Sequence, residues 1–375
     1  MPHLFTDRVY PVNDQLFSAE DLLAKFLLNP DQAGEVSSFS DLHLKVGRPA
    51  FYRCEGDMVP LAGATPLTPE IAERLILPFL NARQIERLRG VPPGDVDTSW
   101  YWSAKKINFR LNVFNDLDGL AAVLRVLPVS IPDVRDIGMP SDLVWQEICM
   151  LLQGLVLVTG PTGSGKSTTI AAILNHLNRS RRARVITLED PIEYIFEGDH
   201  ALFSQRELGR HMGSFSEGLR SALREDPDVI YVGELRDPET VALALTAAET
   251  GHLVFSTLHT RDTRSAITRV IDAMPSERAG ETATQLSLSL AYVLGQKLLS
   301  RTDGGRVLAM EILKNTPSVA NLIRQNSVHQ LQSVIETGKK EGMNTLESHL
   351  RTLLQQGIIS ADEAIQNSNA PGSFR

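Results

Sequence analysis

The sequence has few cysteines and no long apolar run. Its two cysteines, Cys54 and Cys149, lie far apart and match no metal-ligand spacing, which argues against a zinc ribbon and against a disulfide framework. No uninterrupted apolar stretch reaches the roughly 18 residues that a membrane-spanning helix needs, and the N-terminus lacks a basic region followed by an apolar one. We therefore expect the chain to remain in the cytoplasm.

Aromatic residues and positive charge are also scarce. Aromatic residues make up 6% of the sequence and the formal net charge is −8, so nucleic acid is not expected as a partner unless a local basic channel lies within the acidic total. The hydrophobic share of 42% and the charged share of 22% are typical of a globular protein. A length of 375 residues exceeds one ordinary core and predicts two domains.

The most specific motif is a phosphate-binding loop of the GxxxxGK(S/T) type. Its residues are Gly160, Pro161, Thr162, Gly163, Ser164, Gly165, Lys166 and Ser167. Glycines let consecutive N–H groups curl around a polyphosphate, and the helix that follows directs its positive end at the charge. Lys166 would reach the β- and γ-phosphates, Ser167 would complete a Mg²⁺ shell, and Thr168 follows in the same cradle. The loop predicts a nucleoside triphosphate, ATP, and Mg²⁺ as ligands.

Before this loop, the pattern predicts a mixed α+β domain. Apolar and polar side chains alternate over residues 41–62, as in a small antiparallel sheet. An amphipathic helix is expected from Thr68, its N-cap, to about Gly90. Alternating runs at 109–114 and 121–127 predict two more strands. We place this domain at residues 1–127.

A linker and a second domain follow. Three prolines interrupt residues 128–140, which we take as the linker. Residues 141–375 then alternate apolar strands with helices, the pattern of a parallel sheet with crossover helices. The strands are expected at 155–159, 184–188, 229–233 and 253–258.

Polar residues gather where these strands end, which is the edge where open α/β sheets bind ligands. Glu189, Asp190 and Glu193 follow the second strand, near the γ-phosphate, where a water must be oriented or deprotonated. Glu234 ends an apolar strand and can organise Mg²⁺ through its water shell. His259 is a candidate sensor of the γ-phosphate. The alternatives are a solvated turn for the carboxylates and a structural role for the histidine.

Four segments resemble the Walker A, Asp box, Walker B and His box of secretion ATPases. They are residues 160–169, 187–194, 223–234 and 250–260. Within that superfamily the chain is similar to the PilT/PilU group of pilus-retraction ATPases, through residues 40–44, 109–112 and 247–252. Pilus-assembly and type II secretion relatives usually carry a longer N-terminal region and a four-cysteine insertion, and neither fits this chain.

The resemblance implies a fold and roles for particular residues. It implies an α/β protein in which a PAS-like N-terminal domain is joined to a RecA-like ATPase domain, assembled as a hexameric ring. Glu193 would be the catalytic base, with Glu189 as the alternative, and Glu234 the Walker B carboxylate. Arg110 and Arg125 would reach the γ-phosphate, unless they only solvate the outer faces of strands.

The boxes also assign nucleotide-binding residues. They are Glu189, Asp190 and His252, with His259 among the catalytic residues. Two positions depart from the PilT pattern, because Asp118 stands where an arginine is usual and Ala320 replaces the first arginine of a C-terminal helix motif. The segment before Ser18 is additional to that pattern.

The resemblance further implies a motor that withdraws pilin subunits during twitching motility. It would act at the cytoplasmic face of the inner membrane on a pilus platform protein, contact the membrane only through partners, and work beside a related retraction ATPase. The alternatives are a conjugation, type IV or type II secretion ATPase, which includes DNA-handling motors, and a hydrolysis-poor accessory subunit of another motor.

Overall fold

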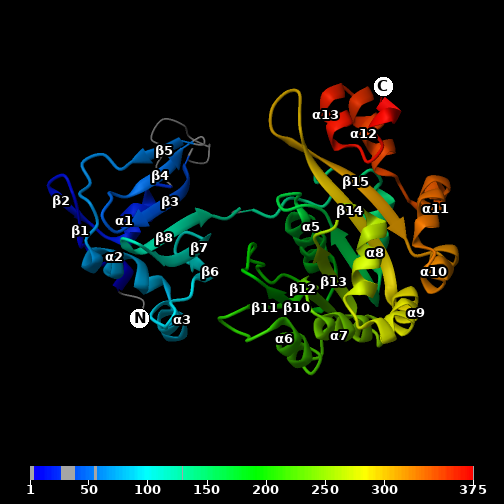
Figure 1. Ribbon diagram of the computed structural model, residues 1–375, viewed down its shortest axis with the longest axis horizontal. Helices are drawn as coiled ribbons and strands as arrows, with labels where there is room; N and C mark the ends of the chain where they lie inside the picture. Colours follow the sequence, from blue (N-terminus) through cyan, green and yellow to red (C-terminus); the bar gives the residue numbers. More distant parts are fainter. Residues whose placement is uncertain (1–3, 27–38, 55–56, 129, 375) are drawn as a thin grey trace. The chain divides into compact units, whose positions relative to one another are not determined.

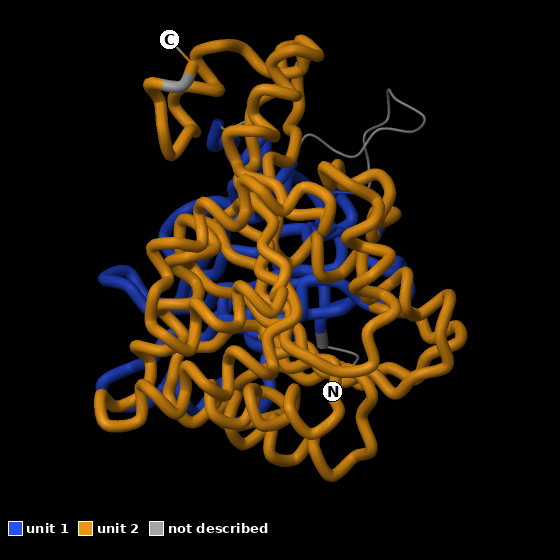
Figure 2. The backbone as a smooth tube through the Cα atoms, turned by 90° about the vertical axis from the view of Figure 1, so that its right-hand side faces the viewer, with its two compact units in different colours: residues 1–130, 190–195 blue, residues 131–189, 196–375 orange. Residues whose placement is uncertain are grey.

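A computed structural model describes residues 4–26, 39–54, 57–128 and 130–374. It divides into two compact units (Figure 2). Unit 1 comprises residues 1–130 together with 190–195, and unit 2 comprises residues 131–189 and 196–375. Residue 129 of the predicted linker lies outside the described residues. Residues 190–195, which sequence reasoning placed in the second domain, belong to the compact unit of the first.

Unit 1 is built on a six-stranded antiparallel sheet with the order β5-β4-β3-β8-β7-β6 (Figure 1). Its strands are β3 (Phe39–Lys45), β4 (Phe51–Cys54), β5 (Asp57–Pro60), β6 (Val96–Trp102), β7 (Ile107–Asp116) and β8 (Gly119–Val126). The alternation predicted from the sequence is confirmed in β7, where buried Phe109, Leu111 and Val113 face the core and the residues between them do not. One face of this sheet is therefore apolar and the other polar.

The single helix predicted from Thr68 to Gly90 is wrong in its extent. Thr68 does cap a helix, accepting the Ile71 N–H, but this helix, α2, spans only Pro69–Ile76. A short 3-10 turn, η2 (Leu77–Phe79), contains Pro78, and α3 (Ala82–Leu88) then begins after its own N-cap. That cap is Asn81, which forms a reciprocal capping box with Gln84. A proline without an N–H and a strong N-cap divide the segment.

The segment before Ser18 also has structure in unit 1. It forms a 3-10 turn, η1 (Leu4–Thr6), and a hairpin of β1 (Tyr10–Val12) and β2 (Gln15–Phe17), followed by helix α1 (Ala19–Ala24). Tyr10 is fully buried, and its hydroxyl donates to the carbonyl oxygen of Thr65. The extension is thus packed into the core of unit 1 rather than appended to it.

Unit 2 contains a seven-stranded sheet with the order β11-β10-β12-β13-β9-β14-β15. All neighbouring strands are parallel except β14 and β15. The four predicted strands are confirmed as β9 (Gly154–Thr159), β10 (Arg184–Glu189), β12 (Val229–Glu234) and β13 (Leu253–Leu258); β11 (Leu202–Glu207), β14 (Leu290–Ser300) and β15 (Arg306–Lys314) are additional. Strand β9 is buried along its whole length, as expected for a parallel sheet covered on both faces.

Helices surround this sheet and continue beyond it (Figure 1). They are α4 (Asp142–Met150), α5 (Lys166–Ser180), α6 (Phe215–Ala222), α7 (Pro238–Glu249), α8 (Thr263–Asp272), α9 (Ala279–Ser289), α10 (Pro317–Arg324), α11 (Leu331–Thr337), α12 (Leu346–Gln355) and α13 (Ala361–Asn367). Within the described residues, no helix combines the length and the apolar character that a membrane span requires.

Candidate active site

The phosphate-binding loop connects β9 to α5, as predicted. Gly165 precedes the first residue of α5 with a φ of 84°, a left-handed conformation that favours glycine. At Gly160 a side chain is excluded by space, because a Cβ there would lie 2.3 Å from the carbonyl oxygen of Gln296. Glycine is therefore required at both ends of the loop, where the backbone turns and where it approaches β14.

Lys166 is the first residue of α5 and is buried, with 7% of its surface exposed. Its Nζ donates to the carbonyl oxygens of Gly160 and Pro161, at 2.9 and 3.0 Å. The ammonium group thus lies across the loop and can exchange these weak acceptors for phosphate oxygens. Ser167 and Thr168 follow in the first turn of the helix and are half-buried.

Gln296 supports the loop and was not predicted from the sequence. It lies on β14, is 2% exposed, and its Nε2 donates to the carbonyl oxygen of Ser164 at 2.6 Å. The neighbouring residue Gly295 is paired with Thr159, the last residue of β9. No local signal marks Gln296, because its role depends on the pairing of two strands far apart in the sequence.

Glu234 and His259 lie together at the same edge of the sheet. The carboxylate of Glu234 is 3.9 Å from His259 Nε2 and forms an ion pair with Arg236. Burial, followed by the positive charge of Lys166, lowers the pKa of His259 below its ordinary value. Lys166 is therefore near enough to His259 to disfavour its protonated form.

An irregularity in strand β12 sets the direction of the Glu234 side chain. The register between β12 and β13 shifts between Val232 and Glu234, and Thr257 Oγ1 donates to the carbonyl oxygen of Gly233. A Cβ at Gly233 would lie 3.2 Å from the carbonyl oxygen of Leu188, on the neighbouring strand. Glycine at this position allows close contact between strands, and a bulge of this kind redirects the next side chain. This explains why β12 ends in Gly-Glu.

The first carboxylate of the Asp box is held firmly in unit 2. Glu189 is 6% exposed, and its Oε1 accepts hydrogen bonds from Thr187 Oγ1 at 2.6 Å and from Gln205 Nε2 at 3.2 Å. These two hydrogen bonds fix the carboxylate at the end of β10. Asp190 is the next residue and the first of the segment that belongs to unit 1.

Glu193 and Arg110 both belong to unit 1. Asn108 on β7 donates from Nδ2 to the carbonyl oxygen of Ile192 at 2.8 Å, which fixes the segment to the sheet. The hydrogen bonds that Arg110 donates to Asp97 raise the pKa of Arg110 against the lowering effect of burial, and the negative charges of Asp97, Glu193 and Asp190 add to the rise. Glu193 is therefore close enough to influence this guanidinium, although 83 residues separate them in the sequence.

The two predicted arginines face each other across neighbouring strands. Arg110 on β7 is paired in register with Arg125 on β8. Arg110 forms two hydrogen bonds with Asp97, and Arg125 Nε donates to Asp41 Oδ1 at 2.6 Å. Both arginines thus have carboxylate partners, which sequence reasoning missed, and both stay partly exposed, at 41% and 62% of their side chains.

His252 lies at the other end of the sheet. It precedes β13, its carbonyl oxygen accepts from the N–H of Gly154 at the start of β9, and its Nδ1 is 3.0 Å from the carbonyl oxygen of Ala247. Because β9 and β13 are parallel, the phosphate loop lies at their opposite ends. We therefore leave His252 out of the proposed nucleotide-binding set.

Two residues depart from the PilT pattern, Asp118 and Ala320, and the structure shows what surrounds them. Asp118 lies between β7 and β8 and forms an ion pair with Lys45, with Asp118 Oδ2 2.9 Å from Lys45 Nζ. Asp116 pairs with the same ammonium group. The carboxylate that replaces an arginine is thus neutralised by a lysine of its own unit. Ala320 is a half-buried residue of α10.

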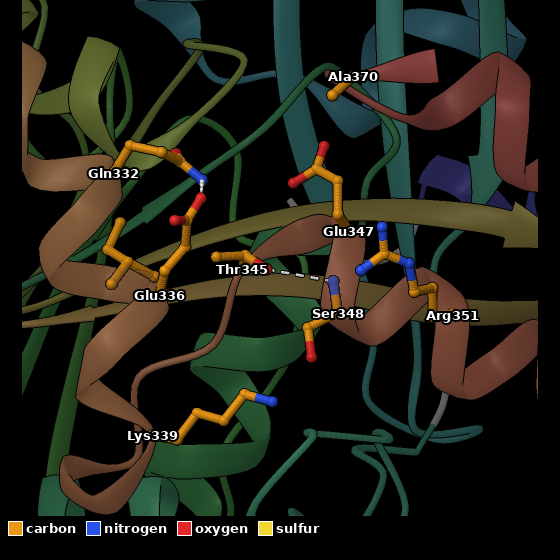
Figure 3. A pocket seen from close by; sticks show the side chains of 9 residues that line it. Gln332, Glu336, Lys339, Thr345, Glu347, Ser348, Arg351 and Ala370 are labelled. Carbon is orange, nitrogen blue, oxygen red and sulfur yellow. Dashed lines mark hydrogen bonds between the residues drawn. The ribbon is translucent and has the colours of Figure 1, made fainter. Parts of the chain in front are cut away.

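A separate pocket of about 380 Å³ lies between α11 and α12 (Figure 3). Both signs of charge line it, including Glu336, Lys339, Glu347 and Arg351. Figure 3 shows Gln332 beside Glu336, its hydrogen-bond partner. None of the predicted site residues lines this pocket, so it is distinct from the edge that carries the phosphate loop.

The residues at that edge fit a magnesium nucleotide. Within the described residues, the buried Oγ of Ser164 has no hydrogen-bond partner, as expected for a polar atom whose partner is a ligand. The phosphate loop leads directly into the N-terminal turn of α5, the end of a helix that favours phosphate. A serine hydroxyl, Ser167, and a carboxylate, Glu234, are oxygen ligands of the kind that Mg²⁺ prefers, directly or through water.

Comparisons with known proteins agree with this geometry. The family model described as "Type II/IV secretion system protein" matches residues 90–366. The "Type IV pilus retractation ATPase PilT" of Pseudomonas aeruginosa is 44% identical over 336 residues, which cover 89% of this chain and 96% of that protein. A "Twitching motility protein" of Neisseria gonorrhoeae is 48% identical over 266 residues, 70% of this chain and 71% of that protein.

A solved structure extends the agreement to the fold. The crystal structure of the pilus retraction motor PilT with bound ADP matches with a TM-score of 0.83 and 40% identity, and the match covers 95% of this chain and 98% of that one. The fold is accordingly the mixed α/β fold of such ATPases. On these matches, the chain belongs to the type II/IV secretion system protein family.

Proposed function

We propose that this protein is a Mg²⁺-dependent P-loop ATPase that powers the retraction of type IV pili. One observation carries the proposal: the strand-end edge of unit 2 gathers the phosphate loop, Lys166, Glu234 and His259, in a chain that is similar over nearly its whole length to a pilus retraction ATPase. The output, pilus retraction, is taken from the relatives.

The residues have separate roles in this proposal. Lys166 exchanges its loop carbonyls for the β- and γ-phosphates, and Glu193 accepts a proton from the attacking water. Arg110 and Arg125 stabilise the charge that develops on the transferred phosphoryl group. A magnesium ion held by Ser167 and Glu234, partly through water, would neutralise the charge of the phosphate oxygens.

Assembly and location complete the proposal. We place the protein in the cytoplasm as a homohexameric ring, with unit 1 as a PAS-like domain and unit 2 as a RecA-like domain. The ring would act at the inner membrane through a pilus platform protein, with a related retraction ATPase as a second partner and without nucleic acid. In a ring, an arginine of one subunit can contribute to the site of a neighbour.

The test measures ATP turnover against protein concentration, together with the mass in solution, for the native chain and for Glu193→Gln. Turnover should rise as a six-subunit species forms. In Glu193→Gln it should fall at least about 100-fold while ATP binding persists, as expected for a lost proton acceptor. The control is Glu197→Gln, the same change at an exposed position four residues away.

Other results point elsewhere. Normal turnover in Glu193→Gln would move the base to another carboxylate, Glu189 being the alternative. A chain that binds ATP but stays monomeric and inactive would favour an accessory subunit. Expression in a twitching-deficient strain that lacks its own retraction ATPase tests the output, because a secretion or conjugation motor would hydrolyse ATP without restoring motility.

A further inference from the structure

A row of charged residues crosses the polar face of the unit 1 sheet. Strand pairing aligns Arg53, Asp41, Arg125, Arg110 and Ser99 on five successive strands. Residues directly opposite each other in an antiparallel sheet have neighbouring side chains, and like charges in such positions repel. The repulsion between Arg125 and Arg110 must therefore be offset by neighbouring carboxylates. Each arginine has one, and the two carboxylates differ in their exposure.

Arg125 forms an ion pair with a buried carboxylate, that of Asp41. Only 2% of the Asp41 side chain is exposed, and its oxygens accept from Arg125 Nε at 2.6 Å and from Ser40 Oγ at 2.6 Å. Although burial alone would raise the pKa of Asp41, these hydrogen bonds hold it below its usual value. A buried carboxylate that loses a cation is destabilised, so this ion pair is harder to break than an exposed one; Arg53 Nε also lies 4.0 Å from Asp41 Oδ2.

Arg110 forms an ion pair with a partly exposed carboxylate, that of Asp97. Its Nε lies 3.1 Å from Asp97 Oδ1, and Nη2 bonds the second carboxylate oxygen, so the pair is bidentate. Asp97 is 34% exposed, and 41% of the Arg110 side chain is exposed. Ion pairs in contact with water contribute little stability and can be exchanged, so Arg110 can leave Asp97 for another anion.

We propose that Asp97 is a releasable counter-ion that holds Arg110 ready and competes with the phosphate of ATP for its guanidinium, whereas the Nε of Arg125 stays bonded to Asp41. The proposal rests on the proposed function, in which Arg110 reaches the γ-phosphate. Asp97 is thus a positioning residue that sets the affinity for ATP without contacting it.

The chemistry of the guanidinium group supports an exchange of this kind. Its fork of N–H donors matches carboxylate and phosphate oxygens with the same two-bond geometry. A triphosphate carries more negative charge than one carboxylate, so it can displace Asp97. Each binding event must first break the Arg110–Asp97 pair, and this cost appears in the Michaelis constant rather than in the turnover number.

The test compares Asp97→Asn with the native protein in steady-state ATP hydrolysis. The change keeps the shape of the side chain but removes the competing charge, so KM for ATP should fall about 3- to 10-fold while kcat stays within about 2-fold. Asp97→Glu should restore the native KM. The matched control is Glu73→Gln, which removes the same charge from another exposed pair of unit 1, with Arg89 at 3.4 Å, and should leave KM unchanged.

An unchanged KM in Asp97→Asn would overturn the proposal, and so would a loss of kcat/KM like that of Arg110→Ala, because Asp97 would then orient the arginine rather than compete for it. Arg110→Ala separates this failure from that of the proposed function. If Arg110→Ala has native kinetics, Arg110 plays no part in hydrolysis. If Arg110→Ala is impaired and Asp97→Asn is native, only the competition is wrong.

Discussion

The strand-end edge of unit 2 and the charged row of unit 1 are both rich in polar groups, but they are built in different ways. The phosphate loop is one continuous segment, and its geometry comes from glycines and backbone groups. The charged row takes one side chain from each of several strands, which only the register of the sheet brings together. The geometry of the phosphate loop is thus determined by local sequence, whereas the charged row depends on how distant strands pair.

The largest effect is expected from a substitution in the phosphate loop, at the strand-end edge of unit 2. Lys166→Ala removes the cation that spans the loop and its charge-assisted bonds to phosphate, each of which contributes about 1.5–3 kcal/mol. ATP affinity, measured by calorimetry, should fall by about 100-fold or more. The control is the exposed Lys339→Ala, on another part of unit 2. Native affinity in Lys166→Ala would mean that the nucleotide binds elsewhere.

The next effect tests the charged row through stability. Asp41→Asn weakens the hydrogen bonds that the buried carboxylate accepts from Arg125 and Ser40 and should cost about 1–3 kcal/mol of the free energy of unfolding. Asp97→Asn, in the exposed pair, should cost less than about 1 kcal/mol. Urea unfolding of the two variants measures both values. Equal losses would show that the two arginines are held in the same way and would remove the distinction between them.

The two units should also differ in their response to acid. Burial lowers the pKa of His349, in unit 2, to about 4, from 6.5. Because folded His349 binds a proton less readily than unfolded His349 does, its contribution is complete above pH 6.5 and is lost as the pH falls towards 4, by up to about 3 kcal/mol. Asp41 has a lowered pKa, so its contribution in unit 1 is retained down to about pH 3.8 and is lost only as the pH falls below that value.

Urea unfolding at pH 7 and pH 4.5 tests whether the contribution of His349 is lost at a higher pH than that of Asp41. His349→Gln keeps an acceptor for the Met310 N–H, which His349 Nδ1 now accepts at 3.0 Å. The variant should lose less stability between the two pH values than the native chain does. The exposed His200→Gln serves as the control and should behave like the native protein. An identical pH response in His349→Gln would assign the acid sensitivity to other groups.

The smallest effect concerns the support of the phosphate loop. Gln296→Ala removes the hydrogen bond to Ser164 and leaves a buried carbonyl oxygen unsatisfied, a cost of about 1–3 kcal/mol. Part of this cost should appear as a loss of ATP affinity of about 5-fold, measured as for Lys166→Ala. Gln285→Ala, which removes an exposed hydrogen bond to Glu249, should have no effect. No change in Gln296→Ala would mean that the loop holds its shape unaided.

The same contrast explains what could be predicted from the sequence. The phosphate loop, the four parallel strands and the polar ends of these strands follow from contiguous motifs, and the structure has them at the predicted positions. The helix from Thr68 to Gly90 was wrong because the amphipathic pattern outweighed Pro78 and Asn81, two local signals that divide it. Reading those signals would have given the observed boundaries.

The partners of the site residues could not be predicted in this way. Gln296 is 132 residues from Ser164, and Asp41 is 84 residues from Arg125. Only the pairing of strands brings them together, and a single sequence gives no register between distant strands. Asp97 is 13 residues from Arg110, in the adjacent strand of a hairpin, and could be found once the pairing of β6 with β7 is known.

Residues 190–195 give the chain an unusual connectivity. Because this short segment belongs to unit 1 and lies between two parts of unit 2, the polypeptide crosses between the units three times, near residues 130, 190 and 195. A protease that cuts the chain near residue 130 would separate residues 1–130 from the rest of the chain, but residues 190–195 of unit 1 would remain on the fragment that carries unit 2. A fragment that begins at residue 131 would carry Glu193 without Asn108, whose hydrogen bond to Ile192 holds that segment to the sheet. Neither half of the molecule can be isolated with all of its own parts.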